Sequence, residues 1–217
     1  FFSKYNFTID ENDPDDSEVG IDPEMLGHIF ENLLEDNKDK GAFYTPKEIV
    51  QYMCENSIGQ YLKTHLGDSF EPSIYKLLRA KFVDEIVKDN AKQIYELLCK
   101  VRVCDPAIGS GAFPMGILNV LFQTRQLLYP YAKYKESFSL AGIKRDIIQN
   151  NIFGVDIEQG AVDIARLRFW LALVVDEEVP QPLPNLDYKI MCGNSQLCRY
   201  ALKTPISEVF KEYNKAG

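Results

Sequence analysis

One nine-residue string, Asp105-Pro-Ala-Ile-Gly-Ser-Gly-Ala-Phe113, limits what this chain can fold into more than any other feature. It follows a short apolar run at 101–104 that is typical of a strand, and it precedes a stretch with apolar residues at helical spacing. Gly109 and Gly111 allow a tight turn and a close approach of a ligand to the backbone. A strand, a glycine-rich turn and a helix in this order predict a nucleotide-binding turn of an α/β fold.

The turn differs from the one that binds dinucleotides. NAD-binding turns follow the pattern Gly-x-Gly-x-x-Gly, whereas this chain has Gly-Ser-Gly-Ala-Phe-Pro. Asp105 at the strand end would repel a pyrophosphate, and it suits a ligand with positive charge, such as the amino group of an amino-acid moiety. A plain tight turn without a ligand is the alternative, and the full nine-residue string disfavours it.

The elements after this turn predict the core. A second strand is expected at 152–155, ending in Asp156, followed by an apolar helix at 159–176 and a third strand at 188–192. Residues 129–139 are aromatic and polar and are expected to form a loop within an inserted segment, 129–150. The order strand–helix–strand–helix–strand predicts a parallel sheet with right-handed crossovers, a Rossmann-like core.

Three regions are expected along the chain. Residues 1–21 are an acidic, irregular lead-in, and residues 22–100 form a helical region. Thr45 and Glu48, with Pro46 between them, form a Thr-x-x-Glu capping box that predicts a helix start inside this region. About two further helices are expected at 73–100. Residues 101–217 form the core, whose sheet is expected to be incomplete because only three strands are clear.

Two further segments carry polar groups after strands. The Asp156 carboxylate can accept both ribose hydroxyls of an adenosine, and Ile157 can pack against an adenine face. The alternative for Asp156 is a helix N-cap. After the third strand, the side chain of Asn194 in Gly193-Asn-Ser195 can pair with an adenine edge. The alternative for this segment is a simple turn.

Composition limits the partners. The formal net charge of −8 weighs against tight DNA binding by these 217 residues, because DNA affinity comes largely from Lys and Arg that neutralise phosphates. No apolar run approaches the roughly 18 residues that a membrane span needs. Two distant histidines and five scattered cysteines predict no metal site and no disulfide framework, and they favour reduced thiols in the cytoplasm. The cysteines are Cys54, Cys99, Cys104, Cys192 and Cys198.

Four segments together resemble the adenine-N6 DNA methyltransferases of restriction–modification systems and the similar phage-defence methyltransferases. They are Gly-Ala-Phe-Tyr-Thr-Pro at 41–46, the string at 105–113, Phe-Gly-Val-Asp-Ile at 153–157 and Ile-Met-Cys-Gly-Asn-Ser at 190–195. They occur in the order that the family has. Leu26-Gly-His-Ile-Phe-Glu-Asn-Leu-Leu34 is similar to the helix that precedes the first segment in large enzymes that carry both restriction and methylation activities. The resemblance covers about residues 22–197.

The resemblance implies a class I methyltransferase core, S-adenosylmethionine as cofactor and a role for each matching residue. Residues that would line the methionine end are Phe43, Tyr44, Thr45, Pro46, Asp105, Ala107 and Gly109, with Gly111 completing the turn. Asp156 would hold the ribose, Ile157 would contact the adenine, and Asn194 with the Ser195 backbone would read the adenine edge.

One motif of the family does not occur. The catalytic Asn-Pro-Pro-Tyr segment has no match, since Pro184-Asn-Leu186 differs from it and precedes the third strand. Residue 1 is Phe, so the chain is expected to be part of a longer protein. Catalytic and target-recognition regions, which would contact double-stranded DNA and flip the adenine, are expected outside it. Two alternatives remain, a non-catalytic cofactor-binding or assembly module of a defence complex and an RNA or protein methyltransferase.

Overall fold

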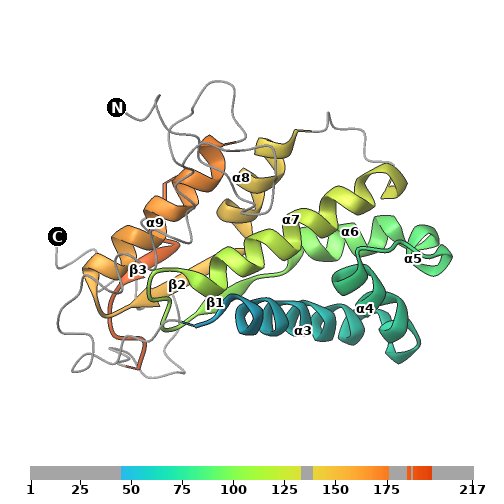
Figure 1. The fold of residues 1–217 in the computed structure, drawn as a ribbon, viewed down its shortest axis with the longest axis horizontal. Helices are drawn as coiled ribbons and strands as arrows, with labels where there is room; N and C mark the ends of the chain where they lie inside the picture. Colours follow the sequence, from blue (N-terminus) through green and yellow to red (C-terminus); the bar gives the residue numbers. More distant parts are fainter. Residues whose placement is uncertain (1–44, 133–138, 176–184, 187, 197–217) are drawn as a thin grey trace, which may run out of the picture.

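The computed structural model describes residues 45–132, 139–175, 185–186 and 188–196, and it contains a three-stranded parallel sheet (Figure 1). The strands are β1 (Val103–Asp105), β2 (Ile152–Asp156) and β3 (Ile190–Cys192), in the order β1-β2-β3. Both pairings are parallel, with Cys104 opposite Phe153 and Val155 opposite Met191. The predicted parallel α/β arrangement is confirmed, and the strands end at one edge.

Three helices connect and cover the strands. α7 (Ala112–Ala132) follows β1, α8 (Leu140–Asn150) precedes β2, and α9 (Gln159–Val174) leads from β2 to β3. α7 contacts β1 and β2, α9 contacts β2 and β3, and α8 packs between α7 and α9. Within the described residues, no helix has the length and hydropathy needed to cross a bilayer.

The end of α7 corrects the start of the loop expected at 129–139, and α8 is a helix that was not expected from the sequence. α7 continues through Pro130 to Ala132, so the expected loop does not begin at 129. α8 begins at a Ser139 cap whose side-chain oxygen accepts the Gly142 backbone N–H at 3.1 Å. A helix forms there because Ile147 and its apolar neighbours bury one face against the core.

The helical region packs against the outer side of α7. Its elements are α3 (Lys47–Leu66), the 3₁₀ turn η2 (Asp68–Phe70), α4 (Glu71–Ala80), the short α5 (Glu85–Asp89) and α6 (Ala91–Lys100). α3 and α6 both contact α7, and α3 runs alongside α7 in Figure 1. The segment 22–44, including residues 26–34 that are similar to a helix of the family, lies outside the described residues.

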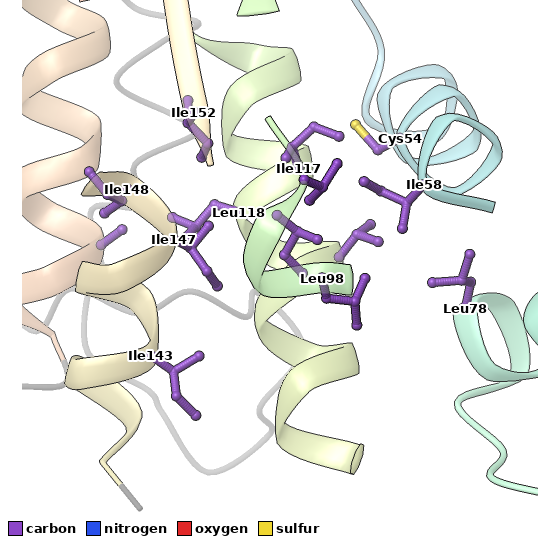
Figure 2. Packing of buried hydrophobic residues seen from close by; sticks show 14 of the residues in the cluster. Cys54, Ile58, Leu78, Leu98, Ile117, Leu118, Ile143, Ile147, Ile148 and Ile152 are labelled. Carbon is purple, nitrogen blue, oxygen red and sulfur yellow. The ribbon is translucent and has the colours of Figure 1, made fainter. Parts of the chain in front are cut away.

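A single apolar cluster joins the sheet, its covering helices and the helical region. Figure 2 shows Leu118 of α7 and Ile147 of α8 facing each other, while Ile58 points from α3 toward α7. Ile58, Leu118 and Ile147 are almost fully buried. Burying such a side chain contributes roughly 1.5–3 kcal/mol, so α7 gains stability from both of its sides.

The predicted capping box at the start of α3 is wrong. The helix begins at Lys47, its N-cap is Pro46 with φ −54° and ψ 143°, and no side chain caps it. The Pro46 carbonyl accepts the backbone N–H groups of Ile49 and Val50 at 3.0 and 3.1 Å. Thr45 therefore lies one residue outside the cap position.

Asn151 ties the end of the helical region to the sheet. Its side-chain amide donates to the carbonyls of Leu98, Cys99 and Val101 at 3.1, 3.2 and 2.6 Å. The Asn151 carbonyl in turn accepts the backbone N–H of Val103 at 2.7 Å. These bonds fix the chain that enters β1 beside the start of β2.

Candidate functional site

The carboxyl edge of the sheet brings together three of the segments that the sequence singles out. β1 ends at Asp105, β2 at Asp156, and Gly193 follows β3. The backbone N–H of Gly193 donates to the Asp156 carbonyl at 2.8 Å. Crevices at the carboxyl ends of parallel strands are where open α/β sheets bind ligands.

The turn after β1 requires its glycines. Gly109 has φ +54° and Gly111 has φ +92°, values that side chains other than glycine disfavour. A Cβ at Gly111 would lie 3.2 Å from Cβ of Ala165 in α9, whereas a Cβ at Gly109 would meet nothing within 4 Å. Gly111 is thus needed for packing, and Gly109 faces open space.

Ile108 anchors this turn on β2. Its backbone N–H donates to the Val155 carbonyl at 3.0 Å, and its side chain is buried. A Cβ at Gly154 would lie 2.3 Å from Cδ1 of Ile108. The absence of a side chain at Gly154 therefore makes room for Ile108, and the turn is held one residue before Gly109.

Asp156 is bound to the turn from the neighbouring strand. Its Oδ2 accepts the backbone N–H of Gly109 at 2.8 Å, and its Oδ1 accepts the backbone N–H of Glu158 at 3.0 Å. The N-cap of α9 is Glu158, without a side-chain cap bond, so Asp156 is not the helix cap. Its carboxylate instead links the end of β2 to the turn that follows β1.

Asp105 carries an oxygen without a partner. Its Oδ1 accepts the backbone N–H of Ala107 at 3.0 Å, while its Oδ2 is buried and unpaired within the described part of the chain. Burial raises the pKa of the Asp105 carboxyl, the Ala107 N–H lowers it, and the nearby Asp156 carboxylate raises it. An unpaired buried acceptor is costly, so this oxygen is poised for a hydrogen-bond donor.

Exposed groups line the other two strand ends. Ile157 is 67% exposed although it is apolar, and its carbonyl accepts the Cys192 thiol at 3.4 Å. Asn194 and Ser195 are exposed, and Asn194 Oδ1 accepts the backbone N–H of Gln196 at 2.9 Å. The segment after β3 forms a turn, which was the alternative for it, and the adenine contact of Asn194 stays a prediction.

The start of α3 lies close to the same edge. Gly116 of α7 permits a close approach, since a Cβ there would lie 2.6 Å from Cγ1 of Val50 and 2.9 Å from Sγ of Cys54. Burial, with smaller effects of Glu55 and Asp105, raises the pKa of Cys54 to about 12. That thiol is therefore inert at neutral pH.

Thr45 and Pro46, two of the remaining expected residues, lie at this end. Thr45 is half-buried and Pro46 is exposed, directly before α3. Phe43 and Tyr44 lie outside the described residues. The described residues contain no group of three His, Cys, Asp or Glu side chains that could hold a metal ion.

Arg168 contacts the turn but was not singled out from the sequence. It projects from α9 and is only 5% exposed, and its Nη1 donates to the Ser110 carbonyl at 3.0 Å. A charged residue inside the otherwise apolar stretch 167–174 was the available signal. Together these contacts make a glycine-lined edge with two carboxylates, which favours cationic and hydroxyl-bearing ligands over phosphates.

Comparison with known proteins finds similar sequences among methyltransferases. The chain is 32% identical over 215 residues to a Methanocaldococcus jannaschii protein named as a candidate type II restriction enzyme and methyltransferase, covering 90% of this chain and 18% of that protein. It is 26% identical over 191 residues to the adenine-specific methyltransferase PglX of Lacticaseibacillus casei, covering 76% of this chain and 15% of PglX. No family profile matches.

A third relative has the same kind of name. The adenine-specific methyltransferase BrxX of Escherichia coli strain HS is 28% identical over 163 residues, which is 65% of this chain and 13% of BrxX. The chain thus spans less than a fifth of the length of these relatives. The resemblance carried by the motifs is confirmed: this chain belongs to the family of adenine-specific DNA methyltransferases of the restriction–modification and phage-defence type.

Proposed function

We propose that this chain is the S-adenosylmethionine-binding part of a site-specific, adenine-N6 DNA methyltransferase, built on a Rossmann-like class I core. The observation that carries the proposal is the buried Oδ2 of Asp105 beside a glycine turn, which has no hydrogen-bond partner among the described residues. A protonated amino group would satisfy this oxygen. The residues present therefore fit the methionine end of the cofactor, and the names of the relatives imply a methyl donor of this kind.

Each residue would then hold one part of the cofactor. Asp105, Ala107 and Gly109 would face the methionine end, where Gly109 leaves open space. Asp156 would accept the ribose hydroxyls, and exposed Ile157 would cover the adenine.

Further residues would complete the cofactor site. Asn194 and the Ser195 backbone would bind the edge of the adenine ring. Gly111 would keep the turn closed on α9, and Thr45 and Pro46, with Phe43 and Tyr44 before them, would line the methionine end from the helical region.

The cofactor would supply a methyl group on a sulfonium, and the protein would hold the reacting groups in the correct orientation. This chain's share is to hold the donor at the carboxyl edge of the sheet, because orientation of reacting groups accounts for much of such catalysis. The 217 residues contain no Asn-Pro-Pro-Tyr segment. We therefore place the groups that hold the target amine, and most DNA contacts, in other parts of the full-length protein.

Calorimetric titration of the chain tests the proposal. S-adenosylmethionine and S-adenosylhomocysteine are titrated, with NAD as the control ligand. We expect both sulfur-containing ligands to bind, and NAD to fail because Asp105 repels its pyrophosphate. Binding of NAD in preference to S-adenosylmethionine, or no binding of either sulfur ligand to the chain and to the full-length protein, would overturn it.

A methyltransferase assay on the full-length protein separates the alternatives. We expect methylation of adenine in duplex DNA. Cofactor binding without transfer to DNA, RNA or protein would instead identify a non-catalytic assembly module, and transfer to RNA or protein alone would identify a methyltransferase of another substrate class.

A further inference from the structure

α9 carries two arginines that reach two different segments of the sheet. Arg168 donates from Nη1 to the Ser110 carbonyl at 3.0 Å and lies 3.4 Å from Ser110 Oγ. Arg166 donates from Nε and Nη2 to the Ile190 carbonyl at 3.2 and 2.6 Å. One helix thus binds the turn after β1 and the first residue of β3.

Burying the charged side chain of Arg168 costs free energy that an apolar side chain at this position would not. A guanidinium stays charged at every relevant pH, and a buried charge is costly unless hydrogen bonds compensate. Its neighbours on α9, Ala165, Phe169 and Ala172, are buried and apolar. An apolar side chain at 168 would suit the core, so the contact with Ser110 gives this arginine a specific role.

Ser110 lies at the centre of the turn. It is buried between Gly109 and Gly111, which both have positive φ. Glycines lose more conformational freedom on folding than other residues, so such a turn needs anchors to hold one conformation. Ile108 anchors one side through β2, and Arg168 anchors the centre from α9.

We propose that Arg168 is a positioning residue that holds the Gly109–Gly111 turn in its ligand-binding conformation. Arg166 does the same for β3 and the segment that follows it, so α9 sets the spacing between the two loops of the site. The inference rests on the proposed function for the identity of the ligand, but its effect on the turn does not depend on any ligand.

Four variants test the role of Arg168. Arg168→Met removes the donor, Arg168→Lys keeps the charge without the planar fork, and Ser110→Ala removes only the hydroxyl. Arg125→Met is the matched control, because Arg125 is equally buried but binds Asp146 at 2.7 Å between α7 and α8. Hydrogen exchange is measured for a peptide covering 106–112, which includes the bonded amides of Ile108, Gly109 and Gly111. Affinity for S-adenosylmethionine is measured by calorimetry.

We expect Arg168→Met to speed exchange in this peptide and to weaken binding roughly tenfold or more, since a hydrogen bond to a charged group is lost. Arg125→Met should lower the melting temperature without either effect. Ser110→Ala keeps the carbonyl that Arg168 binds, so its effect on exchange should be smaller than that of Arg168→Met. If Arg168→Met does not fold, faster exchange in Arg168→Lys supports the role, and parental exchange overturns it. Equal turn exchange in Arg168→Met and Arg125→Met also overturns it. A parent protein that binds no S-adenosylmethionine refutes the proposed function, while the exchange data still decide the role of Arg168.

Discussion

The backbone N–H of Gly109 donates to Oδ2 of Asp156 at 2.8 Å, across 47 residues of sequence. This bond joins the glycine turn after β1 to the end of β2. The carboxylate to which we assign the ribose therefore also fixes the turn that would face the methionine end. The two halves of the site are coupled through one side chain.

Asp156→Ala should weaken S-adenosylmethionine binding by roughly ten- to a hundredfold, because charge-assisted hydrogen bonds of about 1.5–3 kcal/mol each are lost. Calorimetry and a melting curve on the same variant measure affinity and stability separately. Asp156→Asn is the control, since its amide oxygen can still accept the Glu158 N–H. A variant that melts earlier yet binds as the parent does would show that Asp156 is structural and that the ribose assignment is wrong.

Asp105→Asn should raise the melting temperature at pH 7 and weaken S-adenosylmethionine binding. Because the folded-state pKa is raised above its ordinary value of 3.8, the unfolded chain loses this proton first. The free energy of unfolding therefore falls as pH rises from 3.8 through the folded-state pKa, and the variant avoids this loss. The melting temperatures of the parent and of Asp105→Asn, measured from pH 3 to 7, should coincide at the acid end and diverge as the pH rises. Asp163→Asn, at an exposed position of α9, controls for removing one charge. A parent that gains stability over this range relative to Asp105→Asn contradicts the prediction.

Gly154→Ala should destabilise the fold by roughly 1–3 kcal/mol, because the new Cβ overlaps Ile108 and the core must shift. Binding should weaken as well, since Ile108 precedes Gly109 in the turn. Gly160→Ala is the matched control in the first turn of α9, where a Cβ meets nothing within 4 Å. That change should be neutral or stabilise by up to about 1 kcal/mol. Denaturant unfolding of both variants checks the pair, and equal effects would mean that Ile108 relaxes freely.

The 217-residue chain alone should not methylate DNA, because no Asn-Pro-Pro-Tyr segment is present to hold the target amine. Incubation with labelled S-adenosylmethionine and adenine-containing duplex measures the transfer. The full-length protein is the positive control. Label in DNA above background with the chain alone would require acceptor residues within 1–217.

The same chain should bind duplex DNA weakly or not at all, since its net charge is −8. A fluorescence titration at several salt concentrations measures both affinity and its salt dependence. Submicromolar binding with a steep salt slope would contradict the prediction and point to a local basic surface.

The strands could be predicted because each one is a short apolar run that can be recognised from neighbouring residues in the sequence. The runs before Asp105 and Asp156 are apolar and end in an acid, and both form parallel strands there. α8 was not predicted, since Lys144 and its charged neighbours interrupt the apolar pattern. In the fold Lys144 is buried, with its Nζ 3.4 Å from the Ala172 carbonyl and over the ring of Phe122. Such burial depends on tertiary packing that spacing along the chain does not reveal.

The sequence singles out several residues of the candidate site, whose binding roles stay predictions, and it does not reveal the contacts that hold those residues in place. Asp105, Gly109 and Asp156 were singled out from the sequence, and the structure places all three at one edge. The contacts that hold them, Ile108 against Gly154 and Arg168 on Ser110, join residues far apart in sequence. A glycine that clears space for a distant side chain carries no local pattern, so only the fold shows it.

The close approach at Gly116 has a thermodynamic consequence. Because Val50 and Cys54 sit directly on α7 there, the first turns of α3 are fixed before any ligand arrives. A ligand that contacts this helix start would gain attraction without first ordering the backbone beneath it. Preorganisation of this kind spares conformational entropy on binding. A larger residue at 116 would push α3 away from α7, and we expect it to reduce affinity partly through the entropy of association.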